Sequence, residues 1–311
     1  MDGSSNPLKG ISPAAVLQEI ASAIPERTKA NLIVIGSLAV GFRYFGRADK
    51  MAVRTKDADC LLVPYLEAVE AGRAITDDLM SAGWEMRADA DFGRPGAPGT
   101  ADENLPVVRL HPPGNTDWFM ELLTEPASPE ERQKMIHRMS TSRGDFALPS
   151  FGYLALTSYS PMTTHLGIRI ARPQMMALAN LLEHPAIGDA TMSRGFANRP
   201  EIKRANKDLG RVIAIARLET QGDEDALLRW PQEWKEALQA RYARDWRELA
   251  RHAGDGMRRL LASPADLEQA HFTCYMGLLA DMPPTYEAFE IDGRRLVADA
   301  LDQLQLMADA E

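Results

Sequence analysis

The chain has 311 residues, of which 45% are hydrophobic and 25% are charged, and its formal net charge is −9. This length and composition are typical of a globular protein with two domains, and no apolar run approaches the roughly eighteen residues that a membrane span requires. The acidic balance argues against a protein that coats DNA non-specifically, although it is compatible with a local basic site.

The cysteines and the N-terminal residues indicate a reducing compartment. Only Cys60 and Cys274 occur, far apart in the sequence and without the spacing of metal ligands, so neither a zinc site nor a disulfide framework is expected. The first residues, "MDGSSNPLKG", are polar and lack the apolar core of a signal peptide. We therefore expect a cytoplasmic protein without a membrane partner.

The first predicted elements alternate between helix and strand. Residues 13–30 have apolar positions at helical spacing and predict a helix. The apolar run "NLIVIGS" (31–37) predicts a buried strand that stops at Gly36 and Ser37, and residues 38–46 predict a short helix or turn.

A second strand and a longer helix follow. The segment "DADCLLVP" (57–64) predicts a strand that ends at its proline. Residues 65–83 carry apolar positions on one helical face and end in a glycine, which is the pattern of an amphipathic helix.

A hairpin is expected next. Residues 91–104 are rich in glycine and proline and predict a loop. The runs 105–111 and 117–124 flank "PPGN", a strong turn signal, and predict two paired strands. A further short strand is expected at 164–171, whereas residues 125–160 have no clear pattern.

The pattern changes to helices after Arg172 and Pro173, and no internal repeat is present. Breaks between these helices are expected at Pro200, Pro231, Pro264 and "MPPT" (282–285). We therefore predict an α/β domain, with a mixed sheet and flanking helices, at residues 1–172, and a mostly helical domain at residues 173–311.

Three carboxylates stand out in the predicted strands. Asp57 and Asp59 share one face of their strand because successive side chains alternate, and bare like charges so close together repel. Glu121 lies within the apolar run "DWFMELLT", where a buried unpaired glutamate would be costly. If the two strands are neighbours, three hard oxygen ligands converge and suit Mg²⁺. The alternative is that Asp57 and Asp59 lie on a solvated strand end and that Glu121 faces water at a sheet edge.

This combination resembles the nucleotidyltransferases of the DNA polymerase β-like superfamily. Their signature is an apolar strand that ends in Gly-Ser or Gly-Gly, an Asp-x-Asp among apolar residues, and an acidic residue on a later strand. The matching residues here are Gly36-Ser37, Asp57-Ala58-Asp59 and Glu121. The local form "RTKDADCLL" looks most like the abortive-infection (AbiEii-type) toxin branch, so the resemblance implies a nucleotidyltransferase-like fold for residues 1–172.

The resemblance extends over roughly residues 30–217, with departures. "ARPQMMALANLLE" followed by "RPEIKRANKDLGRVIAI" looks like the proline-led helix and the basic Lys-Asp segment of that branch. Glu121 stands where Asp is commoner, and Asn180 stands where the relatives often carry a lysine. The gap from Ser37 to Asp57 is also longer than in minimal members, and the last hundred or so residues have no counterpart.

The resemblance implies a role for each matching residue. Asp57, Asp59 and Glu121 would be the catalytic residues and would hold Mg²⁺, with Glu121 as a ligand or base. Gly36 and Ser37 would bind the triphosphate at a helix start. Read without the resemblance, Gly36-Ser37 is a strand-to-helix turn with Ser37 as the helix cap.

Basic residues complete the predicted nucleotide site. Lys56, next to the aspartates, can reach phosphate, although charges at a strand entrance are usually solvated. A helix opened by Pro200 would carry Lys203 and Lys207, together with Arg204 and Arg211, on one side. Such a stripe can hold a triphosphate or an RNA backbone, or it can be an ordinary solvated face.

The predicted activity is transfer of a nucleoside monophosphate from an NTP to a hydroxyl, with Mg²⁺ as cofactor. The acceptor would be a tRNA 3′ end, a protein or a small molecule. A toxin of a toxin–antitoxin system would also have an antitoxin protein as partner. The alternative is a catalytically inactive protein that binds a nucleotide or a partner on the same fold.

Overall fold

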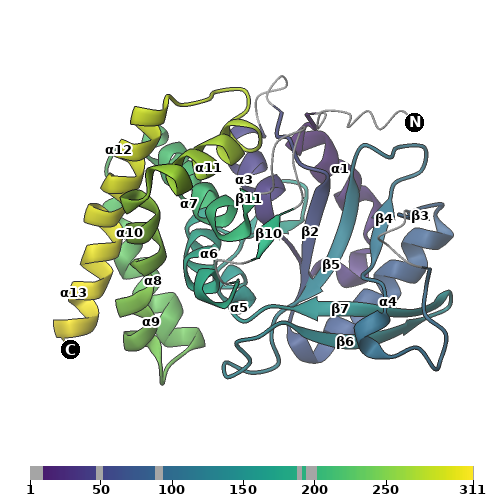
Figure 1. Ribbon diagram of the computed structural model, residues 1–311. Coiled ribbons are helices and arrows are strands. Elements are labelled where there is room, and N and C mark those ends of the chain that lie inside the picture. Colours follow the sequence, from purple (N-terminus) through teal and green to yellow (C-terminus); the bar gives the residue numbers. More distant parts are fainter. Residues whose placement is uncertain (1–9, 47–51, 88–93, 188–190, 194–201, 311) are drawn as a thin grey trace. The chain divides into compact units, whose positions relative to one another are not determined.

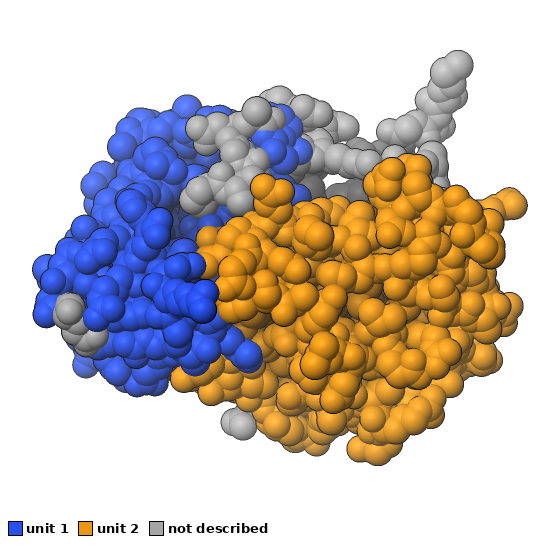
Figure 2. Space-filling model, turned by 90° about the horizontal axis from the view of Figure 1, so that it is seen from below, with its two compact units in different colours: residues 1–10, 52–54, 173–311 blue, residues 11–51, 55–172 orange. Residues whose placement is uncertain are grey.

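A computed structural model describes residues 10–46, 52–87, 94–187, 191–193 and 202–310 of the chain. They form two compact units, shown in different colours in Figure 2. The α/β unit comprises residues 11–51 and 55–172, and the helical unit comprises residues 1–10, 52–54 and 173–311. An α/β fold with a mixed sheet and a helical C-terminal region is therefore confirmed.

The α/β unit is built around a sheet that has nine strands within the described residues (Figure 1). The strands are β1 (Leu32–Val34), β2 (Asp57–Leu62), β3 (Glu85–Met86), β4 (Arg109–His111), β5 (Phe119–Thr124), β6 (Met135–Thr141), β7 (Gly144–Ser150), β8 (Met162–Thr163) and β9 (Arg169–Ile170). Their order is β3-β4-β5-β2-β1-β9-β8, with β7 joined to β5 and β6. β2 runs parallel to β5 and antiparallel to β1, so the sheet is mixed.

Helices cover the sheet of the α/β unit. They are α1 (Pro13–Ala23), α2 (Glu26–Lys29), α3 (Gly36–Phe45), α4 (Tyr65–Ser81), α5 (Leu154–Thr157) and the 3₁₀ turn η1 (Asp102–Asn104). α4 approaches the sheet closely at Gly72, where an added Cβ would lie 2.9 Å from Leu62 Cδ1 and 2.7 Å from Met139 Sδ. α4 therefore packs on the sheet face that carries Leu62, and by alternation this face also carries Ala58 and Cys60, which are both buried.

The helical unit contains α6 (Pro173–Ile187), α7 (Arg204–Gly222), α8 (Ala226–Arg241), α9 (Trp246–His252), α10 (Asp255–Ala262), α11 (Pro264–Tyr275), α12 (Tyr286–Leu296), the π-helical turn η2 (Val297–Leu301) and α13 (Asp302–Ala310). A short ribbon of β10 (Met192–Ser193) and β11 (Ile202–Lys203) accompanies them. Met175, Met176, Trp230 and Trp234 are buried, as expected for core residues. No helix in the described part of the chain has the length and apolarity needed to cross a bilayer.

Several predicted boundaries were wrong. The helix expected at 13–30 is divided into α1 and α2, because Pro25 precedes the second helix and has extended backbone angles. The strand expected at 164–171 is limited to β9, because the chain turns at Gly167, where φ is +74°. Pro231 lies inside α8 and does not break it. Pro200 is outside the described residues.

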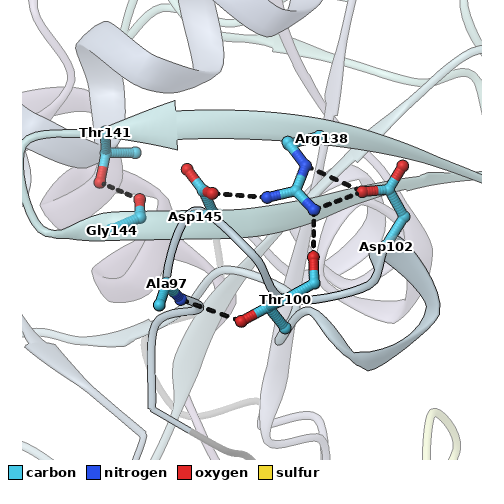
Figure 3. A network of polar contacts seen from close by, with 7 residues as sticks. All are labelled: Ala97, Thr100, Asp102, Arg138, Thr141, Gly144 and Asp145. Atoms are coloured by element: carbon cyan, nitrogen blue, oxygen red, sulfur yellow. Dashed lines mark hydrogen bonds and ion pairs between the residues drawn. The ribbon is translucent and has the colours of Figure 1, made fainter.

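Within residues 125–160, which had no clear sequence pattern, residues 135–150 form a hairpin that the sequence did not predict. β6 and β7 pair antiparallel from Met135↔Ser150 to Thr141↔Gly144. Arg138 on β6 ties this hairpin to the preceding loop (Figure 3): its guanidinium donates hydrogen bonds to Asp102 Oδ1 at 2.8 Å, to Asp145 Oδ2 at 2.5 Å and to the Thr100 carbonyl. Backbone hydrogen bonds exchanged between Gly96 and Asp145 join the same loop to the hairpin, so Arg138 reinforces a contact that the main chain also makes.

Replacement of Asp145 by Asn should lower the melting temperature, and the loss should depend on pH. A hydrogen bond from Ser140, and after it the Arg138 guanidinium, hold the pKa of Asp145 below its ordinary value, although burial acts in the opposite direction. A carboxylate with a lowered pKa stabilises the fold above the unfolded pKa of about 3.9, and this contribution is lost as the pH falls through the folded pKa. Thermal unfolding followed by circular dichroism should show a wide gap between wild type and Asp145→Asn at pH 7.

The same gap should narrow as the pH falls below about 4, where the Asp145 carboxyl is protonated first in the unfolded state, and it should close once the pH is below the lowered pKa of the folded state. Asp117→Asn, at an exposed position of the β4–β5 turn, is the matched control and should melt with wild type at each pH. A gap for Asp145→Asn that stays constant over this range would show that the charge of Asp145 does not stabilise the hairpin.

Candidate functional site

β2 presents the two aspartates on one face of the sheet. Asp57 is exposed and Asp59 is half-buried, whereas Ala58 between them is buried. Because side chains alternate along a strand, both carboxylates project from the face opposite α4. The Thr55 hydroxyl donates a hydrogen bond to Asp57 Oδ1 and so restricts that carboxylate.

β5 adds the third carboxylate to the same face. The parallel register pairs Asp57 with Phe119 and Asp59 with Glu121. Directly paired residues of neighbouring strands project to the same side of the sheet. The structure thus places Glu121 beside Asp59, in an arrangement that the sequence suggested but could not establish.

The turn at Gly36 brings the start of α3 to Asp59. The Ile35 N–H donates a hydrogen bond of 2.9 Å to the Asp59 carbonyl, which aligns the end of β1 with β2. Gly36 has φ +71°, and an added Cβ there would lie 2.6 Å from Asp59 Oδ2. Only glycine fits both this conformation and this close approach. The sequence signal Gly-Ser therefore marks a place where the backbone lies against a carboxylate.

Ser37 and Lys56 flank the aspartates in the sequence. Ser37 is the second residue of α3 and is half-buried, while Ile35 occupies the capping position and no side chain caps the helix. Ser37 is therefore not the helix cap that the alternative interpretation requires. Lys56 is exposed and directly precedes β2, where its carbonyl accepts a hydrogen bond from the Phe119 N–H.

Arg109 is a residue of this face that the sequence reading missed. The antiparallel register of β4 and β5 pairs Arg109 with Glu121, and Arg109 Nε donates a hydrogen bond to Glu121 Oε2. The two side chains are only 21% and 16% exposed. The sequence contained a signal for this pair. The turn "PPGN" fixes a hairpin in which Arg109 and Glu121, each within an apolar run, can lie opposite each other.

Phe119 lies on the same face of β5, directly paired with Asp57 in the strand register. The guanidinium carbons of Arg87 and Arg109 lie 4.5 and 5.9 Å from the centre of its ring. The His111 ring packs edge-on against Phe119 with 5.8 Å between centroids, and His111 Nδ1 lies 2.6 Å from the Trp118 carbonyl oxygen. The face is therefore acidic at β2 and carries two arginines at the β3–β4 edge, with Glu121 and Phe119 of β5 between, and Glu85 of β3 lies on the same face opposite His111.

The donor chemistry of the aspartates fits Mg²⁺, and the third carboxylate is engaged elsewhere. Asp57 and Asp59 offer hard carboxylate oxygens on one face, next to the glycine turn. In the described part of the chain, no three or more His, Cys, Asp or Glu side chains are grouped closely enough to hold a metal ion. Glu121 is paired with Arg109 in this structure, so its predicted role as a metal ligand stays a prediction.

Lys203 and Lys207 belong to the helical unit rather than to the α/β unit that carries the carboxylates. Lys203 lies in β11, before α7 begins, so the prediction that it is on that helix was wrong. Its Nζ pairs with Asp266 of α11 at 2.8 Å, and Asn206 donates to the same carboxylate oxygen. Lys207 is exposed. Their contact with a nucleotide stays a prediction.

The rest of the predicted basic stripe is partly neutralised. Arg204 and Arg211 each lie 3.8 Å from a carboxylate oxygen of Asp208. The Arg204 side chain is 48% exposed, whereas those of Arg211 and Asp208 are only 26% and 13% exposed. The stripe is therefore only in part the solvated face of the alternative interpretation.

Both cysteines are buried free thiols. Burial, and after it the charge of Asp59, raises the pKa of Cys60, and burial raises the pKa of Cys274 to about 12. Because the thiolate is the reactive form, neither should react with iodoacetamide in the native protein at pH 8, and both should react after denaturation. Mass spectrometry of the intact protein measures this. Rapid native labelling of Cys60 would contradict the packing of β2 described above.

No protein-family model matches the chain, and no curated protein matches its sequence.

Proposed function

We propose that the chain is a Mg²⁺-dependent nucleotidyltransferase that moves a nucleoside monophosphate from an NTP to a hydroxyl group. One observation carries this proposal, namely the parallel pairing of β2 and β5 that sets Glu121 beside Asp59 at the glycine turn of α3. Carboxylates on neighbouring strands next to a helix start can serve a metal-bound triphosphate. The resemblance of Gly36-Ser37, Asp57-Ala58-Asp59 and Glu121 to the nucleotidyltransferase signature supports the same conclusion.

In this proposal the residues have separate tasks. Asp57 and Asp59 would hold Mg²⁺, which when bound neutralises the triphosphate and stabilises charge on its oxygens. The Gly36 backbone lets the triphosphate approach without a side chain, and the N–H groups at the start of α3, with Ser37, face an anion favourably. Lys56 offers a further cation to the phosphates.

The acceptor hydroxyl would lose its proton to Glu121 and attack the α-phosphorus. The new bond joins the acceptor oxygen to this phosphorus, the bond to the β-phosphate oxygen breaks, and pyrophosphate leaves. Glu121 can accept the proton, as a base or through a bound water, after its hydrogen bond with Arg109 is broken. The balance of the reaction needs no further reactant.

The acceptor is identified by transfer of label. Each NTP labelled at the α-phosphate is incubated with Mg²⁺, the purified protein and total RNA, and parallel reactions contain protein extract or small hydroxyl compounds. We expect label in one acceptor class, with pyrophosphate released in equal amount. A tRNA 3′ end, a protein hydroxyl and a small molecule are separated by gel and thin-layer analysis. Absence of label in all classes, with Mg²⁺-dependent NTP binding intact, would favour the second candidate function.

The second candidate is a protein that binds a nucleotide or a partner, such as an antitoxin, without catalysis. The observation that favours it is the ion pair between Arg109 and Glu121, which occupies the third carboxylate. Under this alternative, Glu121→Gln should leave NTP binding and partner binding unchanged. Under the leading proposal, the same variant should lose transfer by about a hundredfold or more, as expected for a positioned base.

A further inference from the structure

Two arginines face each other at the β3–β4 edge of the candidate site. The register of β3 and β4 continues to Arg87, whose N–H donates a hydrogen bond of 2.9 Å to the Arg109 carbonyl. Both guanidinium groups lie over the ring of Phe119. Like charges directly opposite each other in a sheet repel. Such a pair in a chain with a net charge of −9 indicates a local preference for an anion.

Glu121 supplies one counter-charge on this face, and Glu85 of β3 lies on the same face opposite His111. Arg109 Nε donates to Glu121 Oε2, and the pair is largely buried. The Glu121 carboxylate therefore has two neighbours of different kinds. It neutralises Arg109 in this structure, and it lies beside Asp59 in the strand register. A second anion at Arg109 would satisfy the guanidinium and set Glu121 free.

A polyphosphate chain fits this position. Arginine binds phosphate oxygens with two parallel hydrogen bonds, and such charge-assisted bonds are among the stronger ones in proteins. The guanidinium carbon of Arg109 lies 5.9 Å from the centre of the Phe119 ring, so the guanidinium can turn from Glu121 to a phosphate while it stays beside that ring. Arg87, stacked on the same ring, adds a second positive charge.

We propose that Arg109, assisted by Arg87, binds the polyphosphate of the NTP, and that this binding releases Glu121 to the side of Asp57 and Asp59. The proposal rests on the proposed function for the identity of the substrate. It makes Arg109 a positioning residue with respect to Glu121. Polyphosphate binding and metal binding then strengthen each other. Polyphosphate takes Arg109 away from Glu121, and a metal ion takes Glu121 away from Arg109.

The test uses inorganic tripolyphosphate without any divalent metal, in EDTA, titrated calorimetrically into the full chain. Without metal, the carboxylates repel the ligand and the arginines attract it. We expect wild type to bind, and Arg109→Gln to bind about tenfold or more weakly, as the loss of a charge-assisted hydrogen bond implies. Arg87→Gln should weaken binding less. Arg143→Gln, at an exposed arginine of the β6–β7 turn, is the matched control and should bind as wild type does.

Glu121→Gln should raise the affinity for tripolyphosphate, whereas Arg109→Gln should lower it. Glu121→Gln removes the competing charge without a change of size, so tripolyphosphate should bind several-fold more tightly than to wild type. If thermal unfolding shows that Arg109→Gln is not folded, the affinity of Glu121→Gln for tripolyphosphate still tests the proposal. Unchanged or weaker binding by Glu121→Gln, or wild-type affinity in folded Arg109→Gln, would overturn the proposal, as would no binding by wild type at millimolar ligand.

The aspartates separate this proposal from the proposed function. Asp57→Ala/Asp59→Ala should bind metal-free tripolyphosphate at least as tightly as wild type, because two repelling charges are gone. A loss of binding in this folded variant would contradict the assignment to the arginines. If the arginine dependence holds but labelled NTP is never transferred, the polyphosphate site stands and the transferase proposal fails.

Discussion

Asp59→Asn should abolish nucleotidyl transfer while leaving the protein folded. Asp59 lies nearest to both the Gly36 turn and Glu121, so loss of its charge removes the central carboxylate of the site. A bound metal contributes several kcal/mol to such a reaction, so we expect a loss of at least about a thousandfold in the rate of label transfer. Asparagine has nearly the same size, so the melting temperature should stay close to that of wild type.

The matched control for Asp59→Asn is Asp117→Asn, which removes one negative charge at an exposed turn of the same unit. It should transfer label at the wild-type rate. A folded Asp59→Asn protein with wild-type activity would contradict the proposed role of β2. Equal losses in both variants would show that net charge, and not position, sets the rate.

The second large effect is expected at Gly36. In Gly36→Ala the new Cβ would have to occupy a point 2.6 Å from Asp59 Oδ2, so either Asp59 or the start of α3 must move. A displacement of about 1 Å at a catalytic group can cost about a hundredfold in rate. We also expect a loss of about 2–3 kcal/mol in the free energy of unfolding, within the range of strained single substitutions.

Gly167→Ala separates the two causes of this effect. Gly167 has φ +74°, close to that of Gly36, but an added Cβ there would have no described neighbour within 4 Å. Its variant should therefore lose only the roughly 1 kcal/mol that a left-handed backbone imposes on alanine, and should keep full activity. Denaturant unfolding and label transfer measure both. Equal losses of activity in the two variants would argue against a site at Asp59.

The sequence predicted the elements that have strong local patterns. β2 and α4 were found because their apolar periods are regular and because proline and glycine mark their ends. The hairpin of β4 and β5 was found from its turn. β6 and β7 were missed because polar residues interrupt both strands and because Pro149 lies within β7, where a proline usually argues against a strand.

The candidate site was predictable in part for the same reason. Alternation along β2 placed Asp57 and Asp59 on one face, and Gly36 was marked by its position after an apolar run. β2 and β5 are adjacent in the sheet although they lie about sixty residues apart in the sequence, and no local pattern specifies such a pairing. The turn between β4 and β5 offered a signal for the pair of Arg109 and Glu121, but the position of this pair next to Asp59 also depends on the register of β2 with β5.

The central claim is that Asp57 and Asp59 form a metal–triphosphate site, and calorimetric titration of each NTP with Mg²⁺ tests it most directly. We expect wild type to bind at least one NTP, to lose most of that affinity when EDTA replaces Mg²⁺, and to lose the magnesium dependence in Asp57→Ala/Asp59→Ala. Magnesium-dependent binding that persists in the folded double variant, or no binding of any NTP by wild type, would contradict the claim.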